Sequence, residues 1–248
     1  MLNEERGDFY FHLEEFRRAI IRCVVYVLLG AVVTFIFWRD LCGLFVAPVK
    51  GLLDSGLLLV TNQPTEAFTL SMQLALIGGL VVALPAVLVD LWAFVSPGLL
   101  PNERRYVAYG LPAVLLLFLL GVAFAYVVFP VGIRFLYSFS SSAGLKPFWS
   151  ITAYLKFLLW SCVTCGIIFE LPVVVGLLAM LGLVSSSFLA GKRRHAIIVV
   201  LIFAAVITPS VDAITMTVVS LPIVLLYEVG ILVARRVEKA KRRREAAG

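Results

Sequence analysis

Six long apolar runs constrain this chain more than any other feature of its sequence. They lie at about 20–37, 70–95, 106–130, 154–180, 195–208 and 213–233. A hydrocarbon core about 30 Å thick is crossed by about 20 helical residues, because each residue adds 1.5 Å along the helix axis. The runs therefore predict an all-α polytopic membrane protein with six transmembrane helices.

The composition supports this class of protein and excludes others. Of the 248 residues, 62% are apolar and 15% are charged. An average soluble domain is about half apolar and about 25% charged, so a water-soluble globule could not cover so much apolar surface. The same numbers exclude a disordered or collagen-like chain. Because the length sets no second domain apart, we expect a single membrane domain over 1–248.

The basic residues are sorted between the two sides of the predicted bundle. Sixteen of the 21 fall on one side: four in the N-terminal segment, two in the second connection, three in the fourth and seven in the tail. The other five are Arg39, Lys50, Arg134, Lys146 and Lys156. Since Lys and Arg accumulate in cytoplasmic loops, both termini are predicted to be cytoplasmic.

The tail at 234–248 carries the densest positive charge. We interpret it as a topology signal that also favours anionic lipid at the cytoplasmic face. In a soluble protein, the net charge of +6 could suggest nucleic acid. Here the membrane topology accounts for it, and no nucleic-acid partner is expected.

Two of the predicted helices are short for a bilayer. The fifth, at 195–208, spans only about 21 Å. The sixth reaches the bilayer thickness only if it includes 229–233. We therefore expect a bundle that is thin on the side of helices 5 and 6.

Prolines lie inside four of the apolar runs, at Pro85, Pro112, Pro172 and Pro222. Each proline removes one helical hydrogen bond and bends its helix. One interpretation is that the helices are merely curved. The other is that several bent helices form a concave face that receives another chain.

Small residues recur at four-residue spacing in two of the runs. Ala75, Gly79 and Ala83 form one such stripe, and Cys162 and Gly166 begin a second. Small residues let membrane helices approach closely, so both stripes predict helix packing. Because Cys162 and Cys165 lie in an apolar helix, we expect buried small residues and no redox motif.

The segment at 8–19 is predicted to be an amphipathic helix at the cytoplasmic interface. Its apolar residues share one helical face, at Phe9, Leu13, Phe16 and Ile20. Glu14 can pair with an arginine three or four residues on, whereas Glu15 has fewer dedicated partners.

Glu15 and Glu103 are predicted to lie on the same side of the membrane. The ordinary interpretation is an exposed interfacial carboxylate at Glu15, and at Glu103 an acid in the first turn of a helix, where the helix dipole favours it. Alternatively, the two carboxylates suit a partner with two positive charges. Arginine would be preferred over lysine, because a guanidinium binds a carboxylate bidentately.

Glu170 is a third acid that needs an explanation, because it lies in the middle of the fourth apolar run. A charge at bilayer depth costs at least about 2.5–3.5 kcal/mol, so Glu170 is either protonated or faces water or another polar group. It is the basis of an alternative function, a proton-coupled small-solute transporter. By contrast, Asp212 lies at a tight external turn and is expected to cap the sixth helix.

No enzyme or metal signature occurs in the sequence. The serine-hydrolase, zinc-protease and nucleotide-binding motifs are absent. The only histidines, His12 and His195, lie at predicted cytoplasmic ends. We therefore expect a protein without catalysis, metal or cofactor.

Several separated motifs occur in order along the chain. They are HLEEFRR (12–18), AP (47–48), PTEAF (64–68), WAFVSPGLLPNERR (92–105), FELP (169–172), KRRHAIIVVLIFAAVITPSVD (192–212) and LPIVLLYE (221–228). In these motifs the chain resembles the TatC family, the multi-spanning subunits of the twin-arginine protein translocase. The resemblance covers about residues 9–236. One departure is the turn TPSVD, which is often richer in proline in the family.

The resemblance implies six helices in a concave, glove-like bundle that acts as a receptor in the bacterial cytoplasmic membrane. Such a receptor binds signal peptides that carry two adjacent arginines. With single-span TatA- and TatB-type subunits, in an oligomeric complex, it exports folded proteins using the proton-motive force. The resemblance assigns signal-peptide binding to Glu15, Glu103, His12, Arg17 and Phe94.

The resemblance also assigns two further roles. The side chain of Glu170 is expected to face the concave side of the bundle within the membrane. Contact with a partner subunit is expected at Thr208, Pro48 and Asp212.

Overall fold

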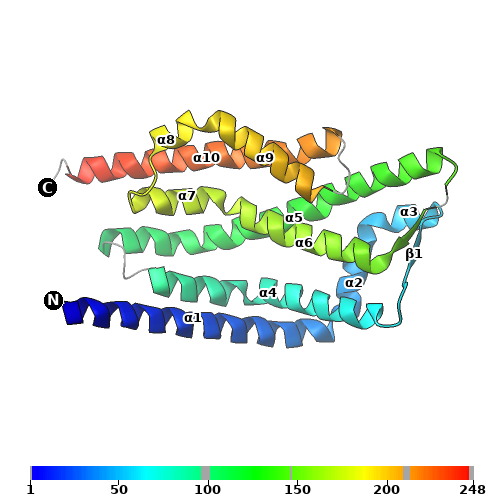
Figure 1. The fold of residues 1–248 in the computed structure, drawn as a ribbon, viewed down its shortest axis with the longest axis horizontal. Helices are drawn as coiled ribbons and strands as arrows, with labels where there is room; N and C mark the ends of the chain where they lie inside the picture. The colour runs from blue at the N-terminus through cyan, green and yellow to red at the C-terminus, as the bar shows by residue number, and fades with distance from the viewer. Residues whose placement is uncertain (1, 96–100, 146, 209–212, 246–248) are drawn as a thin grey trace. The chain divides into compact units, whose positions relative to one another are not determined.

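A computed structural model describes residues 2–95, 101–145, 147–208 and 213–245, and the side chains of 14–94, 110–145, 147–208, 213 and 215–242. All six predicted apolar runs are helical over nearly all of their described residues (Figure 1). The elements are, in chain order, α1 (Leu2–Ile36), α2 (Trp38–Val46), η1 (Ala47–Val49), α3 (Lys50–Asp54), β1 (Leu58–Val60), α4 (Glu66–Val95), α5 (Pro101–Ser142), β2 (Phe148–Ser150), α6 (Ile151–Phe169), α7 (Leu171–Met180), α8 (Ser186–Gly191), α9 (Arg193–Ile207) and α10 (Ala213–Glu245).

Five stretches of these described helices are long and apolar enough to cross a membrane. They are Glu14–Ile36, Glu66–Phe94, Gly110–Ser142, Ile151–Met180 and Thr215–Arg242. The fifth predicted membrane helix corresponds to α9, which has only 15 residues. The predicted shortness of this helix is therefore confirmed.

The chain forms two compact units, which we describe separately. The first, unit 1, comprises 1–42 and 68–115, and the second, unit 2, comprises 43–67 and 116–248. Unit 1 is built on α1 and α4, which lie side by side (Figure 1). The predicted single membrane domain and its concave shape stay predictions.

In unit 1, α1 runs without interruption through the predicted interfacial segment. The segment at 8–19 is helical as expected and is continuous with the first membrane run, because α1 extends from Leu2 to Ile36; its position at the membrane interface stays a prediction. Between Gly7 and Gly30 the sequence contains no glycine or proline that could end a helix.

The close approach of α1 and α4 depends on glycine. A Cβ added at Gly79 would lie 2.6 Å from the Cα of Ala31 and 2.8 Å from the carbonyl oxygen of Val27. A Cβ at Gly30 would lie 2.6 Å from the carbonyl oxygen of Gly79. Ala75 and Ala83 are also buried, which confirms the predicted small-residue stripe.

In unit 2, small residues bring α5 and α6 together in the same way. A Cβ at Gly121 of α5 would lie 2.8 Å from the Cα of Gly166 in α6, and one at Gly166 would lie 2.6 Å from the ring of Phe118. Cys162 and Cys165 are buried free cysteines, as expected for packing residues.

The fourth membrane span, predicted at 154–180, is interrupted once. α6 ends at Phe169 and α7 begins at Leu171, and together they form the stretch Ile151–Met180 that is long enough to cross a membrane. Pro172 lacks the N–H that would continue the α6 ladder. Instead, the carbonyl oxygen of Glu170 accepts hydrogen bonds from the N–H groups of Val173 and Val174, both at 3.0 Å.

The connection expected at 131–150, between the third and fourth membrane runs, is mostly helix. The sequence suggested that the helix ends near Pro130, but α5 continues to Ser142. This extension is held by contacts with the segment after α2: Arg134 donates to the carbonyl oxygen of Pro48 at 3.1 Å, and Tyr137 donates to that of Ser55 at 2.6 Å.

Beyond these contacts, β1 and β2 form a parallel two-stranded sheet in which Leu58 pairs with Phe148. The sequence did not predict the sheet, because strands of three residues leave no periodic pattern.

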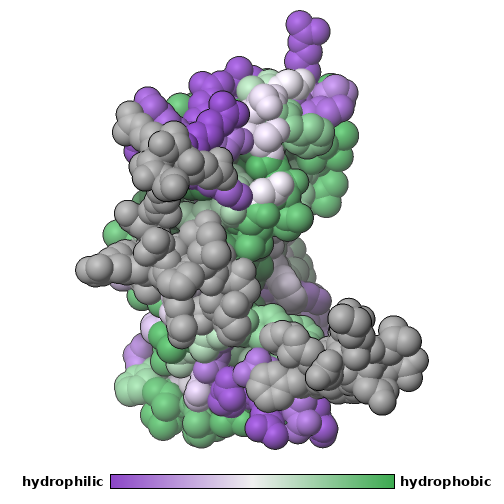
Figure 2. Space-filling view, turned by 90° about the vertical axis from the view of Figure 1, so that its left-hand side faces the viewer, coloured by the Kyte–Doolittle hydropathy of each residue, from purple (hydrophilic) through white to green (hydrophobic). Residues whose placement is uncertain are grey.

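The prediction of a short sixth membrane helix is wrong for the helix as a whole. The 33 residues of α10 extend to Glu245, because the basic tail after Val233 is rich in strong helix formers. Within unit 2, α10 packs against α7 and α9. Figure 2 looks onto the ends of α8 and α10 and shows hydrophilic side chains gathered there. The exposed basic residues of this region are Lys192, Arg194, Arg235, Arg236, Lys239, Lys241 and Arg242.

Three side-chain contacts fasten α8 and the start of α9 to α10. Glu238 accepts hydrogen bonds from the N–H and the hydroxyl of Ser186 at 2.6 and 2.7 Å. Tyr227 donates to the carbonyl oxygen of Leu189 at 2.7 Å. Arg193 donates two hydrogen bonds to Glu228, at 2.6 and 2.9 Å, and this pairing raises the pKa of Arg193.

Candidate functional site

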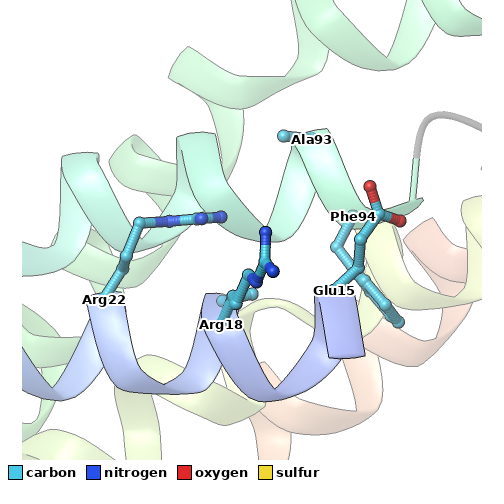
Figure 3. A pocket seen from close by; sticks show the side chains of 6 residues that line it. Glu15, Arg18, Arg22, Ala93 and Phe94 are labelled. Carbon is cyan, nitrogen blue, oxygen red and sulfur yellow. The ribbon is translucent and has the colours of Figure 1, made fainter. Parts of the chain in front are cut away.

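A pocket in unit 1 lies between one face of α1 and the C-terminal part of α4. Glu15, Arg18, Ala19 and Arg22 line it from α1, at spacings of three, four and seven residues that place them on one helical face. Ala93 and Phe94 line it from α4. Figure 3 shows these two walls and the arginine side chains reaching from α1 toward α4.

Two ion pairs set the electrostatics of the pocket. The Nε of Arg22 lies 2.8 Å from Oδ2 of Asp90, and the Asp90 side chain is only 15% exposed. On the outer side, Arg18 pairs with Glu14 at 3.0 Å, and these two side chains are 69% and 60% exposed. The inner pair is therefore the better shielded from water and salt.

An aromatic contact joins the two walls. The ring centroids of Phe16 in α1 and Phe94 in α4 lie 5.3 Å apart, with the ring planes tilted by 47°. Such an arrangement is favourable for aromatic pairs. Phe94 thus gives the pocket an apolar side next to a carboxylate.

The pocket is small. Its volume of about 160 Å³ equals roughly five water molecules, at about 30 Å³ each in the liquid. It has room for a small charged head group such as one guanidinium with the end of its alkyl stem.

The structure places the predicted binding residues as follows. Glu15 and Phe94 come together in the pocket. Arg17 is exposed on α1 and is not among the residues that line it. The side chains of His12 and Glu103 lie outside those that the structure describes.

The Arg22–Asp90 pair was not predicted from the sequence, where Asp90 lies near the end of the second apolar run. The signal that could have revealed the pair was one acid and one base at the same interface on neighbouring membrane helices.

Glu170 lies at the break between α6 and α7. Both of its carboxylate oxygens are buried without a hydrogen-bond partner among the described residues. The sequence-based expectation of an unusual acid at membrane depth is consistent with this environment.

The residues expected to contact a partner subunit lie in different elements of unit 2. Pro48 is part of η1, and Thr208 follows α9. Thr208 is 4% exposed and its hydroxyl donates to the carbonyl oxygen of Ala204 at 2.9 Å. Asp212 lies outside the described residues.

An apolar face of α9 is left exposed by the described part of the chain. Its side chains are between 56% and 79% exposed, and they are Ile198, Val199, Ile202 and Val206. Apolar exposure of this kind is normal toward lipid or toward another membrane helix.

The fold and the pocket define a polytopic helical membrane protein with a charged pocket between two of its helices. The family model of the Sec-independent protein translocase protein TatC matches residues 11–222. The chain belongs to the TatC family, and it is a six-span membrane subunit of a protein translocase.

Individual relatives agree with this assignment. The TatC protein of Carboxydothermus hydrogenoformans is 36% identical over 225 residues, which cover 90% of this chain and 91% of that protein. The TatC protein of Koribacter versatilis is 37% identical over 241 residues, which cover 96% and 88%.

Solved structures of TatC proteins also match this chain. A crystal structure of the twin arginine translocase receptor TatC matches with a TM-score of 0.78 and 30% identity, over 92% of this chain and 99% of that one. A second crystal structure of this receptor, in the detergent DDM, matches with a TM-score of 0.79 and 30% identity, over 90% and 99%.

Proposed function

We propose that this chain is the signal-peptide receptor of a twin-arginine translocase. The observation that carries the proposal is the pocket of unit 1, where the carboxylate of Glu15 and the ring of Phe94 line one small cavity. A guanidinium needs a carboxylate for its head and tolerates an aromatic ring beside it. The pocket therefore binds one arginine of the pair.

The chemistry also explains a preference for arginine over lysine. A guanidinium can donate two parallel hydrogen bonds to Glu15, whereas an ammonium acts as a point charge. In our proposal, Glu103 binds the second arginine from the first turn of α5, and His12 and Arg17 lie next to the peptide.

The wider role follows from the family and from the charge distribution. We infer that the chain lies in the bacterial cytoplasmic membrane with both termini in the cytoplasm, so that the pocket faces the incoming precursor. TatA- and TatB-type single-span subunits complete the complex, which exports folded proteins using the proton-motive force. The receptor itself performs no catalysis and needs no cofactor.

The partner helix is proposed to pack on the exposed apolar face of α9. Thr208 ends this helix, but its side chain is buried and bonded to Ala204. The contact is therefore made by the neighbouring face, at Ile202 and Val206. Pro48 and Asp212 are proposed to belong to the external end of the same contact region.

The test replaces Glu15 by Gln in the full-length protein in membranes. The measurement is photo-crosslinking to a synthetic signal peptide with paired arginines. A hydrogen bond to a charged group contributes about 1.5–3 kcal/mol, so binding should weaken about 10- to 150-fold. The matched control is Asp40→Asn, which removes an exposed carboxylate of unit 1 that does not line the pocket and should change binding little.

A peptide with paired lysines serves as the second probe. We expect the unsubstituted receptor to crosslink it weakly, and Glu15→Gln to remove most of the difference between the two peptides. Unchanged binding of the arginine peptide by the Glu15→Gln protein would contradict the proposed function. The transporter alternative predicts proton-coupled uptake by the chain alone, and that assay separates it from a receptor.

A further inference from the structure

The charge of the proposed pocket depends on more than Glu15, because basic side chains also line it. Two arginines, Arg18 and Arg22, line the same cavity as Glu15. A receptor for positively charged side chains should repel them if its own guanidinium groups were uncompensated, because like charges a few ångströms apart interact unfavourably.

Carboxylates adjacent to the pocket compensate both arginines. Asp90 holds Arg22, and Glu14 holds Arg18. Among the described residues, each arginine that lines the cavity therefore has a carboxylate partner that offsets its charge.

The two pairs differ in how firmly they are held. Asp90 is mostly buried and joins α4 to α1, two segments that are 68 residues apart in sequence. The Arg18–Glu14 pair lies within one helix and is exposed, so water and salt screen it. The Arg22–Asp90 pair is the one that can fix the charge of the cavity.

We propose that Asp90 is a positioning residue for signal-peptide recognition. It holds the Arg22 guanidinium against α4 and cancels its charge, so that the cavity attracts an arginine side chain. The inference rests on the proposed function and adds to it a second, indirect determinant of affinity. It identifies no new contact with the peptide, because Asp90 acts through Arg22.

This role predicts that the two single substitutions change peptide binding in opposite directions. Asp90→Asn releases an uncompensated positive charge into the cavity and should weaken peptide binding at least about fivefold. Arg22→Gln leaves an extra negative charge and should leave binding unchanged or strengthen it. The double variant restores the charge balance and should bind within about twofold of the unsubstituted protein, since coupled charges are not additive.

If the Arg22–Asp90 ion pair served only to hold α1 against α4, the expected effects on peptide binding would differ. Either single substitution would break the tie, so both would weaken binding, and the double variant would not recover. Salt provides an independent readout, because the deficit of Asp90→Asn should shrink as salt screens the released charge. A deficit caused by displaced helices would not respond to salt in this way.

The experiment measures binding of the arginine signal peptide to the full-length protein in lipid nanodiscs, at two salt concentrations. The matched controls are Arg39→Gln and Asp40→Asn, which make the same charge changes in unit 1. Arg39 lies 17 residues beyond Arg22, past the end of α1 at Ile36. Neither control should change binding.

If Asp90→Asn does not fold, Asp90→Glu and the exchanged pair Arg22→Asp with Asp90→Arg replace it. Both keep the compensating charges and should bind the peptide. Equal losses in the two single variants without recovery in the double variant would overturn the inference. If that result is obtained while Glu15→Gln loses binding, only the role of Asp90 is wrong and the proposed receptor function stands. If Glu15→Gln binds the peptide normally, the proposed receptor function is wrong.

Discussion

Asp90 and Glu170 show two ways in which this chain places a carboxylate among apolar helices. Asp90 is mostly buried but accepts a hydrogen bond from Arg22 at 2.8 Å. Glu170 is buried at its oxygens without such a partner among the described residues. A buried polar group without a hydrogen bond lowers stability, so we expect Glu170 to act outside the folding of the single chain.

We expect Glu170→Leu to stabilise the purified protein and to impair export. Removing a buried polar group that lacks a partner gains about 1–3 kcal/mol, and for a chain of this size each kcal/mol raises the Tm by about 2–4 °C. The measurements are thermal unfolding in detergent and precursor export in cells.

The control for this substitution is Ile168→Leu, which keeps the apolar character of a neighbouring position at the end of α6. It should alter neither the Tm nor export noticeably. A lower Tm in the Glu170→Leu protein would show that the carboxylate has a stabilising partner in the folded chain.

Of the six residues that line the pocket, the family motifs pointed to two, Glu15 and Phe94, and not to Arg18 or Arg22. The partner of Arg22 could not be predicted from spacing, because the register between α1 and α4 is set by the glycine contact at Gly30 and Gly79. That contact places Asp90 opposite Arg22.

At the scale of helices, glycine and proline mark the places where the chain departs from a simple bundle. Gly79 permits the close approach of α1 and α4, and Pro172 separates α6 from α7. Pro85 and Pro222, by contrast, lie inside continuous helices. A proline therefore predicts a local loss of one hydrogen bond, while the neighbouring helices decide whether the helix ends there.

We expect Gly79→Ala to separate α1 from α4 and to weaken peptide binding. The added methyl group would overlap the backbone of Ala31, and overpacking of this kind costs about 1–3 kcal/mol. Because the pocket lies between the same two helices, its two walls would move apart. Thermal unfolding and crosslinking to the arginine peptide measure the two effects.

The matched control is Gly43→Ala in α2, where an added Cβ meets no described atom within 4 Å. Alanine is the better helix former, so this variant should be as stable as the unsubstituted protein or slightly more stable. Equal stability of the two variants would contradict a packing role for Gly79.

Helix boundaries were predictable where composition changes sharply and were missed where tertiary contacts decide them. The start of the sixth membrane helix at Ala213 matches the prediction. The extension of α5 to Ser142 does not follow from its sequence, because it depends on hydrogen bonds from Arg134 and Tyr137 to segments more than 80 residues away. Such long-range contacts leave no local signal.

At the scale of the whole molecule, the sequence predicted the class of protein from two independent properties. Apolar length gave six membrane helices, and the distribution of basic residues gave an orientation. Hydrophilic side chains gather at the ends of α8 and α10 (Figure 2). Hydrogen bonds of Glu238 and Tyr227 fasten these two helices together. The positive charge is therefore displayed on ordered helices.

A subunit of an oligomeric translocase must also leave apolar surface for its partners, and α9 is the element best suited to this. Its 15 residues are too few to cross a bilayer of ordinary thickness alone, while Ile202 and Val206 remain 61% and 79% exposed. Packing these side chains against another helix provides van der Waals contact. Such contact drives the association of helices in a membrane, where a hydrophobic driving force is absent.

We therefore expect a photoreactive amino acid at Ile202 or Val206 to crosslink the full-length protein to a small single-span subunit in native membranes. The two positions are four residues apart and lie on one helical face, so both should give an adduct of the same size. Val127 of α5 is 67% exposed and provides the control, which should give no such adduct. An adduct at Val127 with none at either α9 position would show that the partner packs on a different helix.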